Sequence, residues 1–382
     1  MTLIYVVAGE ASGDVLGARL IARLREARPG LRFAGIGGER MAEVGVESLF
    51  PMRELALMGL LEVLPNLRAL ARRLDETVAD IADTRPAALV TIDSPGFALR
   101  VARRVRPLGI PVIHYVAPQV WAWRQGRVKE MAHRLDRILA LLPFEAPFFE
   151  RAGIPVTFVG HPVLESGAET GDAARFRARH GIAAHERVVL VMPGSRRTEV
   201  GRLLPIFGET LRLVAGRHPG LRPVVPLAGP VEEAVRAGAS GWGPAPILVR
   251  EIGDKHDAFA AAEAGLIKSG TSSLEVAMAG VPMVVGYKLN PVTAWLIRRM
   301  AKVKYVSIVN LLADREVIPE LLLEDCRPPL LAEALGRLLA GEGVAAQRAG
   351  FAQVMSLLAP PDGGSPSEAA ARAVLGMVAD RS

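Results

Sequence analysis

Short apolar runs alternate with helical patterns along the first half of the chain. Continuous apolar strands separated by helices are typical of a parallel sheet that is covered on both faces. A helix over residues 14–26, with leucine and isoleucine on one face, follows the first run. The pattern predicts strands at residues 3–8, 32–36, 87–93, 111–116 and 138–142.

The same pattern starts again in the second half, where a long helix is expected from about Thr198. Two successive doubly wound, Rossmann-like α/β domains fit this order, and 382 residues exceed the usual size of one hydrophobic core. The Gly-rich and acidic segment at 160–171 is typical of a linker. The predicted strands of this half are residues 187–192, 222–227, 264–268 and 282–287.

We therefore expect an N-terminal domain of residues 1–165, a second domain of residues 166–345 and a helical tail of residues 346–382. The last helix, with Ser367 as its predicted N-cap, has enough Ala, Val, Leu and Met to pack against another element. We expect it to pack back on the first domain.

Composition narrows the choice of ligand and compartment. The formal net charge of +6 favours phosphorylated ligands or anionic lipid, and no zinc spacing, aromatic RNA-binding strand or basic heptad helix indicates nucleic acid. The single cysteine, Cys326, cannot form an internal disulfide and is expected to be a packing or surface residue in a reducing, cytoplasmic compartment. The N-terminus is typical of a strand, and no apolar run approaches the ~20 residues of a membrane span, so we expect a soluble protein.

The first candidate site is the loop GEASGD at residues 9–14, between the first strand and the first helix. Doubly wound folds bind ligands at the carboxyl ends of strands, and small residues such as Ser12 and Gly13 let the backbone approach a ligand. Glu10 places an acid at the mouth of this loop. The spacing matches neither a P-loop nor a dinucleotide fingerprint, and a plain strand-to-helix turn remains the alternative.

A second acid, Asp93 in TIDSPGF, ends a buried strand at the same rim as Glu10. It can act as a general base toward a sugar hydroxyl or cap the following helix, and its spacing favours neither. His114, inside an apolar strand, is better interpreted as a core residue than as a catalyst. Trp121 and Trp123 suit a sugar or lipid face, or aromatic packing under a loop.

The strongest local pattern lies in the second domain. Pro193-Gly194-Ser195-Arg196-Arg197 follows a strand and precedes a helix, so that backbone N–H groups, a hydroxyl and arginines meet at one rim and favour phosphate. The run Ser269, Gly270, Thr271 follows another strand, where a helix start favours a diphosphate. Glu275 can accept the hydroxyls of a ribose, or is simply an acid on a first helical turn.

The apolar segment at residues 55–64 is flanked by arginines. It predicts either an ordinary buried helix or a face that rests on an anionic membrane or holds acyl chains. Residues 290–304 can serve the same purpose from the second domain. The residues of this acyl or membrane patch are Leu57, Met58, Leu60, Leu61, Val63 and Leu64.

Taken together, these motifs resemble the lipid-A-disaccharide synthase family over nearly the whole chain. The specific ones are GEASGD and APQVWAW, whereas the SGTSSLE element at 269–275 is shared by many UDP-sugar transferases. The other motifs also occur in the family's order; they are MGLLEVLP, DSPGF, LLPFE, GHP, PGSRRTE and VSIVNLLADRE. Two departures occur: DSPGF lacks the family's second acid, and Gln125 replaces a proline in the tryptophan loop.

The resemblance implies a glycosyltransferase B fold, with two domains facing a cleft, and an inverting enzyme that needs no metal or other cofactor. Its donor would be UDP-2,3-diacylglucosamine and its acceptor 2,3-diacylglucosamine 1-phosphate, giving a β-1,6-linked disaccharide 1-phosphate and UDP. It adds Asn310 to the donor residues Ser195, Arg196, Ser269, Thr271 and Glu275, with Asp93 the preferred base and Glu10 the second choice.

The implied location is cytoplasmic, in peripheral contact with the inner membrane, and a homodimer is compatible with the sequence. Two other functions stay open. One is another UDP-sugar enzyme of the same fold, such as a MurG-type transferase or a UDP-GlcNAc 2-epimerase. The other is a peripheral protein that binds glycolipid without turning it over.

Overall fold

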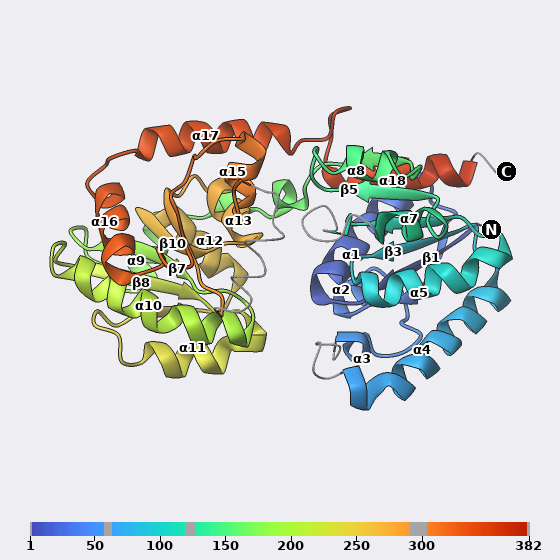
Figure 1. The fold of residues 1–382 in the computed structure, drawn as a ribbon, viewed down its shortest axis with the longest axis horizontal. Helices are drawn as coiled ribbons and strands as arrows, with labels where there is room; N and C mark the ends of the chain where they lie inside the picture. Colours follow the sequence, from blue (N-terminus) through green and yellow to red (C-terminus); the bar gives the residue numbers. More distant parts are fainter. Residues whose placement is uncertain (1, 57–62, 119–126, 291–303, 380–382) are drawn as a thin grey trace. The chain divides into compact units, whose positions relative to one another are not determined.

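The computed structural model describes residues 2–56, 63–118, 127–290 and 304–379. These residues form an α/β protein with two parallel sheets, each of six strands within the described parts of the chain (Figure 1). The chain divides into two compact units. Unit 1 comprises Met1–Pro162 and Leu358–Ser382, and unit 2 comprises Val163–Leu357.

The sheet of unit 1 has the order β2-β1-β3-β4-β5-β6. The chain first steps from β1 to β2 and then continues on the other side of β1 with β3, so the topological switch point lies between β1 and β3. Ala8 pairs with Ile92, which brings the carboxyl ends of these two strands level. The strands are β1 (Leu3–Ala8), β2 (Arg32–Ile36), β3 (Ala88–Ile92), β4 (Val112–Tyr115), β5 (Arg137–Ala140) and β6 (Val156–Phe158).

Helices cover both faces of this sheet because its strands are apolar on both sides. One face packs against α1 and α18, whose Leu20 and Val374 are fully buried, and the other against α4 and α5. The described helices of unit 1 are α1 (Ala11–Ala27), α2 (Glu39–Glu43), α3 (Arg53–Ala56), α4 (Val63–Thr84), α5 (Pro95–Val105), α7 (Arg127–Ala132), α8 (Ala146–Glu150) and α18 (Pro366–Ala379).

Unit 2 repeats the topology in a second sheet, with the order β12-β11-β10-β7-β8-β9. Its switch point lies between β7 and β10, and Met192 pairs with Ile267 at their carboxyl ends. The strands are β7 (Arg187–Met192), β8 (Leu221–Pro226), β9 (Ile247–Val249), β10 (Ala264–Lys268), β11 (Met283–Tyr287) and β12 (Glu320–Leu322).

The core of unit 2 includes Phe207 from α10, Leu335 from α16 and Cys326, which is a buried thiol. The described helices of this unit are α9 (Ala173–Arg179), α10 (Arg197–Ala215), α11 (Glu232–Ala239), α12 (Ile252–Ala261), α13 (Ser272–Met278), α15 (Ile308–Ala313), α16 (Pro328–Leu339) and α17 (Val344–Leu357). Short 3-10 turns occur at Arg106–Leu108, Pro162–Glu165, Ala168–Thr170 and Gly229–Val231.

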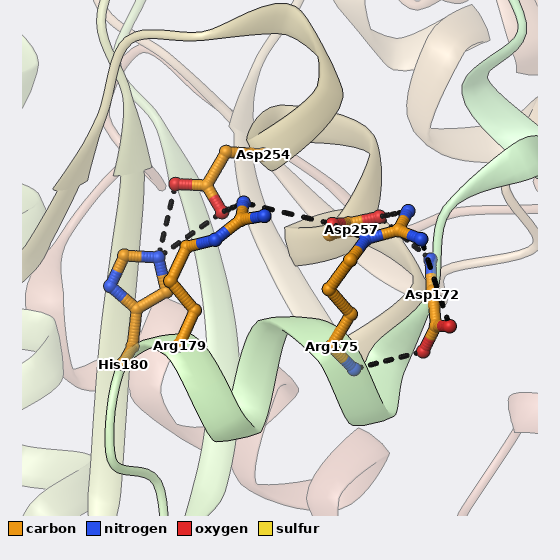
Figure 2. Close-up of polar contacts among 6 residues, drawn as sticks. All are labelled: Asp172, Arg175, Arg179, His180, Asp254 and Asp257. Atoms are coloured by element: carbon orange, nitrogen blue, oxygen red, sulfur yellow. Dashed lines mark hydrogen bonds and ion pairs between the residues drawn. The ribbon is translucent and has the colours of Figure 1, made fainter.

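A polar network fastens α12 to α9 at the start of unit 2 (Figure 2). The Asp257 carboxylate is almost fully buried and accepts hydrogen bonds from the Arg175 guanidinium at 2.5 and 2.6 Å. These hydrogen bonds hold the pKa of Asp257 below its usual range. Asp254, one turn earlier, is paired with Arg179 at 2.7 Å and lies 3.0 Å from His180 Nε2. The network fixes the helix whose Lys255 contacts Glu275.

The structure differs from the sequence-based expectations at several places. The three-residue strands β6, β9 and β12 were not expected, since so short a run shows no period. Ser365, not Ser367, caps α18, because the Ser365 hydroxyl accepts from the Glu368 N–H and the Glu368 carboxylate accepts from the Ser365 N–H. The expected tail from residue 346 is divided, with α17 in unit 2 and α18 in unit 1.

Candidate functional site

The loops that follow β1 and β3 meet at the switch point of unit 1. Gly9 is in such close contact with the second loop that a Cβ at this position would lie 2.4 Å from the Ser94 Oγ. Glu10 and Ser12 are exposed, and Glu10 takes the N-cap position of α1 without a side-chain cap. The buried Gly13 packs against the Ile92 carbonyl, which lies 3.4 Å from the place of a Cβ. The predicted residues of this rim therefore lie together.

Asp93 lies in a strained turn directly after β3. Asp93 and Ser94 both have left-handed backbone conformations, with φ of 50° and 48°, which residues other than glycine adopt much less often. The Asp93 Oδ1 accepts a hydrogen bond from the Ser94 N–H at 2.8 Å, and the Asp93 N–H donates to the Tyr115 carbonyl at 2.9 Å. Such strain is typical of sites where a side chain must be held in one direction.

The last acid of GEASGD has a different part in the structure. Asp14 is 4% exposed, and its carboxylate accepts hydrogen bonds from the backbone N–H groups of Gly38, Arg40 and Met41 at 2.7, 3.0 and 3.0 Å. A carboxylate in this position satisfies the otherwise unpaired donors at the start of α2. Asp14 therefore fastens the first loop to the segment after β2.

His114 agrees with its interpretation as a core residue. Its ring is fully buried in β4, and its Nδ1 lies 2.8 Å from the Thr91 Oγ1. Burial lowers the pKa of His114 to about 4, so the ring is neutral at pH 7. Its Nε2 has no hydrogen-bond partner among the described residues.

The loops that follow β7 and β10 meet at the switch point of unit 2. Gly194 has a φ of 115°, and a Cβ there would lie 2.6 Å from the Glu199 Oε2, so both the backbone and the space require glycine. The Glu199 carboxylate accepts from the N–H groups of Ser195 and Arg196, each at 3.3 Å. Glu199 thereby orders the turn that was predicted to hold phosphate. This role of Glu199 was not predicted from the sequence.

Glu199 also reaches across the switch point to Lys268, the last residue of β10. The Lys268 Nζ lies 3.1 Å from the Glu199 Oε1, and both side chains are largely buried. Burial of the Glu199 carboxyl opposes ionisation, but the charges of Lys268 and Arg196 outweigh it and lower the pKa of Glu199. The ion pair is therefore intact at neutral pH.

The second loop of this rim contains the predicted residues Ser269, Gly270 and Thr271, and the predicted Glu275 follows on α13. The Ser269 hydroxyl is buried and donates to the Val306 carbonyl at 3.2 Å, whereas Thr271 is exposed at the start of α13. The Glu275 carboxylate lies 2.7 Å from the Lys255 Nζ of α12. Glu275 is thus held in one place by a helix that is itself fixed by the network of Figure 2.

Comparison with known proteins decides the family. Residues 4–360 match the family model described as lipid-A-disaccharide synthetase. The chain is 55% identical to the lipid-A-disaccharide synthase of Granulibacter bethesdensis over 98% of both chains. It is 52% identical to that of Gluconobacter oxydans, over 98% of this chain and 91% of the relative. The chain belongs to the lipid-A-disaccharide synthase family.

Members of the lipid-A-disaccharide synthase family are UDP-sugar glycosyltransferases, so the chain is an enzyme of this class. Solved structures agree on its fold. The UDP-GlcNAc 2-epimerase of Neisseria meningitidis matches with a TM-score of 0.64 at 14% identity, over the full length of both chains. UGT2 of Phytolacca americana matches with a TM-score of 0.62 at 14% identity, over 100% of this chain and 99% of that one. The fold is the glycosyltransferase B fold.

Asn310, which resemblance to the synthase family added to the donor residues, is fully buried in unit 2. Its Nδ2 donates to the Ile318 carbonyl and to the Glu320 carboxylate, both at 2.8 Å. Its Oδ1 accepts from the N–H groups of Val317 and Ile318 at 2.8 and 3.0 Å. Both donors and both lone pairs of the amide are therefore engaged in holding the segment before β12.

Several predicted segments lie outside the described residues. These are Leu57, Met58, Leu60 and Leu61 of the patch, Trp121 and Trp123 of the tryptophan loop, and residues 291–303. Val63 and Leu64 lie in the first turn of α4. Across the described ranges, no helix has the length and apolar character to cross a membrane, and no three His, Cys, Asp or Glu side chains are grouped as metal ligands.

Proposed function

We propose that this enzyme transfers a 2,3-diacylglucosamine residue from UDP to the 6-hydroxyl of 2,3-diacylglucosamine 1-phosphate. The products are the β-1,6-linked disaccharide 1-phosphate and UDP. Membership of the lipid-A-disaccharide synthase family supports this reaction class. The observation that carries the mechanism is the position of Asp93, an acid with a partly exposed side chain in a strained turn at a switch point.

In this mechanism Asp93 takes the proton of the acceptor hydroxyl while its oxygen attacks C1 of the donor sugar. The bond between C1 and the diphosphate oxygen breaks, and UDP leaves with the electron pair. One displacement inverts the configuration at C1, which requires only one base. The strained turn and the Ser94 N–H, 2.8 Å from the Asp93 Oδ1, support a fixed direction for the carboxylate.

Glu10 is the second candidate for the base. It is exposed at the start of α1, on the loop that contacts Ser94 through Gly9. In the present proposal Glu10 orients the acceptor, and the exposed Ser12 and the backbone at Gly13 contact its sugar or phosphate. Small residues in this loop leave room for such an approach.

Unit 2 then binds the UDP moiety. Its diphosphate contacts the turn of Gly194, Ser195 and Arg196, where the Arg196 side chain is 77% exposed and able to reach an anionic ligand. The loop of Ser269, Gly270 and Thr271 borders the same switch point. Positive groups here stabilise the negative charge that develops on the departing UDP.

Glu275 accepts hydrogen bonds from the ribose hydroxyls. Its ion pair with Lys255 holds the carboxylate in place but leaves lone pairs for a diol, since a carboxylate can accept about four hydrogen bonds. Asn310 supports this site from within unit 2, because its amide is fully engaged there.

Acyl chains of both substrates require an apolar surface. We assign it to the patch of Leu57, Met58, Leu60, Leu61, Val63 and Leu64, which precedes and enters α4. On this helix Arg73 is paired with Glu54 and Glu76, whereas Arg68 and Arg72 are exposed. Exposed arginines beside an apolar segment favour peripheral binding to anionic lipid at the inner membrane.

The direct test is incubation of the purified protein with UDP-2,3-diacylglucosamine and the monosaccharide acceptor. We expect UDP release only when both substrates are present, with one disaccharide formed per UDP. Conversion of UDP-GlcNAc to its 2-epimer without an acceptor would favour an epimerase instead. A folded protein that releases no UDP would exclude the proposed reaction.

A further inference from the structure

Lys268 ends one of the two strands that border the switch point in unit 2. It is the last residue of β10, the strand that borders β7 on one side and β11 on the other. Lys268 pairs with Gly286 in β11, and the preceding Ile267 pairs with Met192, directly before the Gly194 turn. Ligands of doubly wound sheets bind in the crevice at this position.

The side chain of Lys268 is held in a defined environment. Its Nζ lies 3.1 Å from the Glu199 Oε1 and 5.5 Å from the centre of the Tyr287 ring, and only 16% of the side chain is exposed. A Cβ at Gly270 would lie 3.1 Å from the Nζ, so glycine leaves the ammonium its space. Strands β10 and β11, helix α10 and the loop after β10 thus converge on one positive charge.

The partner of Lys268 indicates which ligand this charge suits. Glu199 is its one hydrogen-bonding side chain among the described residues, whereas an ammonium has three donors. The same carboxylate accepts from the N–H groups of Ser195 and Arg196 and contacts the Arg196 guanidinium at 3.2 Å. An internal anion therefore collects the kinds of donor that bind phosphate oxygens.

We propose that Lys268 is a direct ligand of the terminal phosphate of a nucleoside diphosphate, and that Glu199 is the positioning residue that holds it there. This inference rests on the proposed function, because it deepens the donor site of unit 2. Before nucleotide binds, Glu199 compensates the ammonium charge. In the complex, the remaining donors of Lys268 contact the β-phosphate of UDP next to the Gly194 turn.

The test compares Lys268→Met with Lys268→Arg and with the control Lys129→Met. Methionine keeps most of the length of the lysine side chain without its charge. Lys129 is an exposed lysine of α7 in unit 1. Binding of UDP, UMP and uridine is measured by titration calorimetry on the full-length protein. For Lys268→Met we expect UDP to bind about 10-fold to 100-fold more weakly, and uridine to bind unchanged.

Lys268→Arg should recover most of the UDP affinity, and Lys129→Met should match the wild type. Equal weakening of UDP and uridine by Lys268→Met would assign Lys268 a purely structural part and overturn the proposal. UDP affinity equal to that of the wild type would overturn it as well. Both outcomes leave the proposed function intact if the wild type binds UDP and transfers sugar, whereas a wild type that does neither contradicts the function itself.

Discussion

Gly9 and Ser94 join the two loops of the unit 1 switch point, since a Cβ on residue 9 would lie 2.4 Å from the Ser94 Oγ and 2.6 Å from its Cβ. Ser94 in turn donates its N–H to the Asp93 carboxylate. The first loop therefore limits where the carboxylate of the proposed base can point, although neither Gly9 nor Ser94 supplies the base itself.

Gly9→Ala should lower the transfer rate by displacing the Asp93 turn. Because the added methyl group meets the Cβ as well as the hydroxyl of Ser94, the turn must move, at a cost of about 1–3 kcal/mol in the free energy of unfolding. Ser94→Gly in the same chain removes the clash and suits the φ of 48° at this position. We expect the double variant to regain stability and part of the activity, measured by thermal unfolding and UDP release. A Gly9→Ala enzyme with normal stability and rate contradicts this.

Glu275 should confer discrimination between ribose and deoxyribose. If its carboxylate accepts the ribose hydroxyls, UDP binds about 10-fold more tightly than 2′-deoxy-UDP to the wild type. Glu275→Gln should remove most of that ratio, measured by calorimetry, because the charge-assisted hydrogen bonds are lost. The exposed Glu333→Gln, on α16, serves as the control and should keep the wild-type ratio. A ratio that persists in Glu275→Gln places the ribose elsewhere.

Glu199 should make the stability of the protein depend on pH in the acid range. Its pKa is lowered in the folded state, so the ionised group stabilises the fold above its unfolded pKa of about 4.3, and this contribution disappears as the pH falls through the lower, folded value. Glu199→Gln should cost about 1–2 kcal/mol at pH 7, through loss of the ion pair with Lys268 and a weaker helix cap. Chemical denaturation should show this gap closing below about pH 4. A gap that is constant with pH would falsify the assignment.

We expect Asn310 to contribute mainly to the free energy of unfolding, and less to contacts with a ligand. Asn310→Ala leaves the N–H groups of Val317 and Ile318 and the Ile318 carbonyl without their partner, and the expected loss is about 3 kcal/mol or more. The control Gln353→Ala removes one exposed hydrogen bond to Arg315 and should change stability by less than about 0.5 kcal/mol. Denaturant midpoints measure both. Comparable small losses in the two variants would contradict the structural role of Asn310.

The apolar runs predicted the fold well because buried parallel strands are apolar on both faces. The run at 187–192 and the run at 264–268 coincide with β7 and β10, and the loops after β1, β3, β7 and β10 follow from them. The order of the strands in each sheet did not follow from the sequence. This order brings the loops after β1 and β3 together at one switch point, and the loops after β7 and β10 together at the other. The edge strands β6, β9 and β12 were missed because three residues carry no recognisable pattern.

Residue roles were harder to predict where they depend on contacts between distant segments. The motif GEASGD places Asp14 in a candidate ligand loop, but its carboxylate accepts hydrogen bonds from the N–H groups of Gly38, Arg40 and Met41, which come much later in the chain. The sequence assigned Glu199 no role, because its contact with Lys268 depends on β7 and β10 being neighbours in the sheet. Asn310 was assigned to the donor site by resemblance to the family alone. Such a resemblance does not show which groups the amide contacts.

The proposed mechanism separates catalysis, assigned to Asp93, from nucleotide binding, assigned to unit 2. Asp93→Asn tests it cleanly, because asparagine tolerates a left-handed backbone and its Oδ1 can still accept from the Ser94 N–H, so the turn should persist. The decisive measurement is the transfer rate of this variant beside its affinity for UDP. We predict a rate about 10²-fold to 10⁴-fold below the wild type with unchanged UDP affinity. A variant that transfers sugar at the normal rate would contradict the assignment and leave Glu10 as the candidate base.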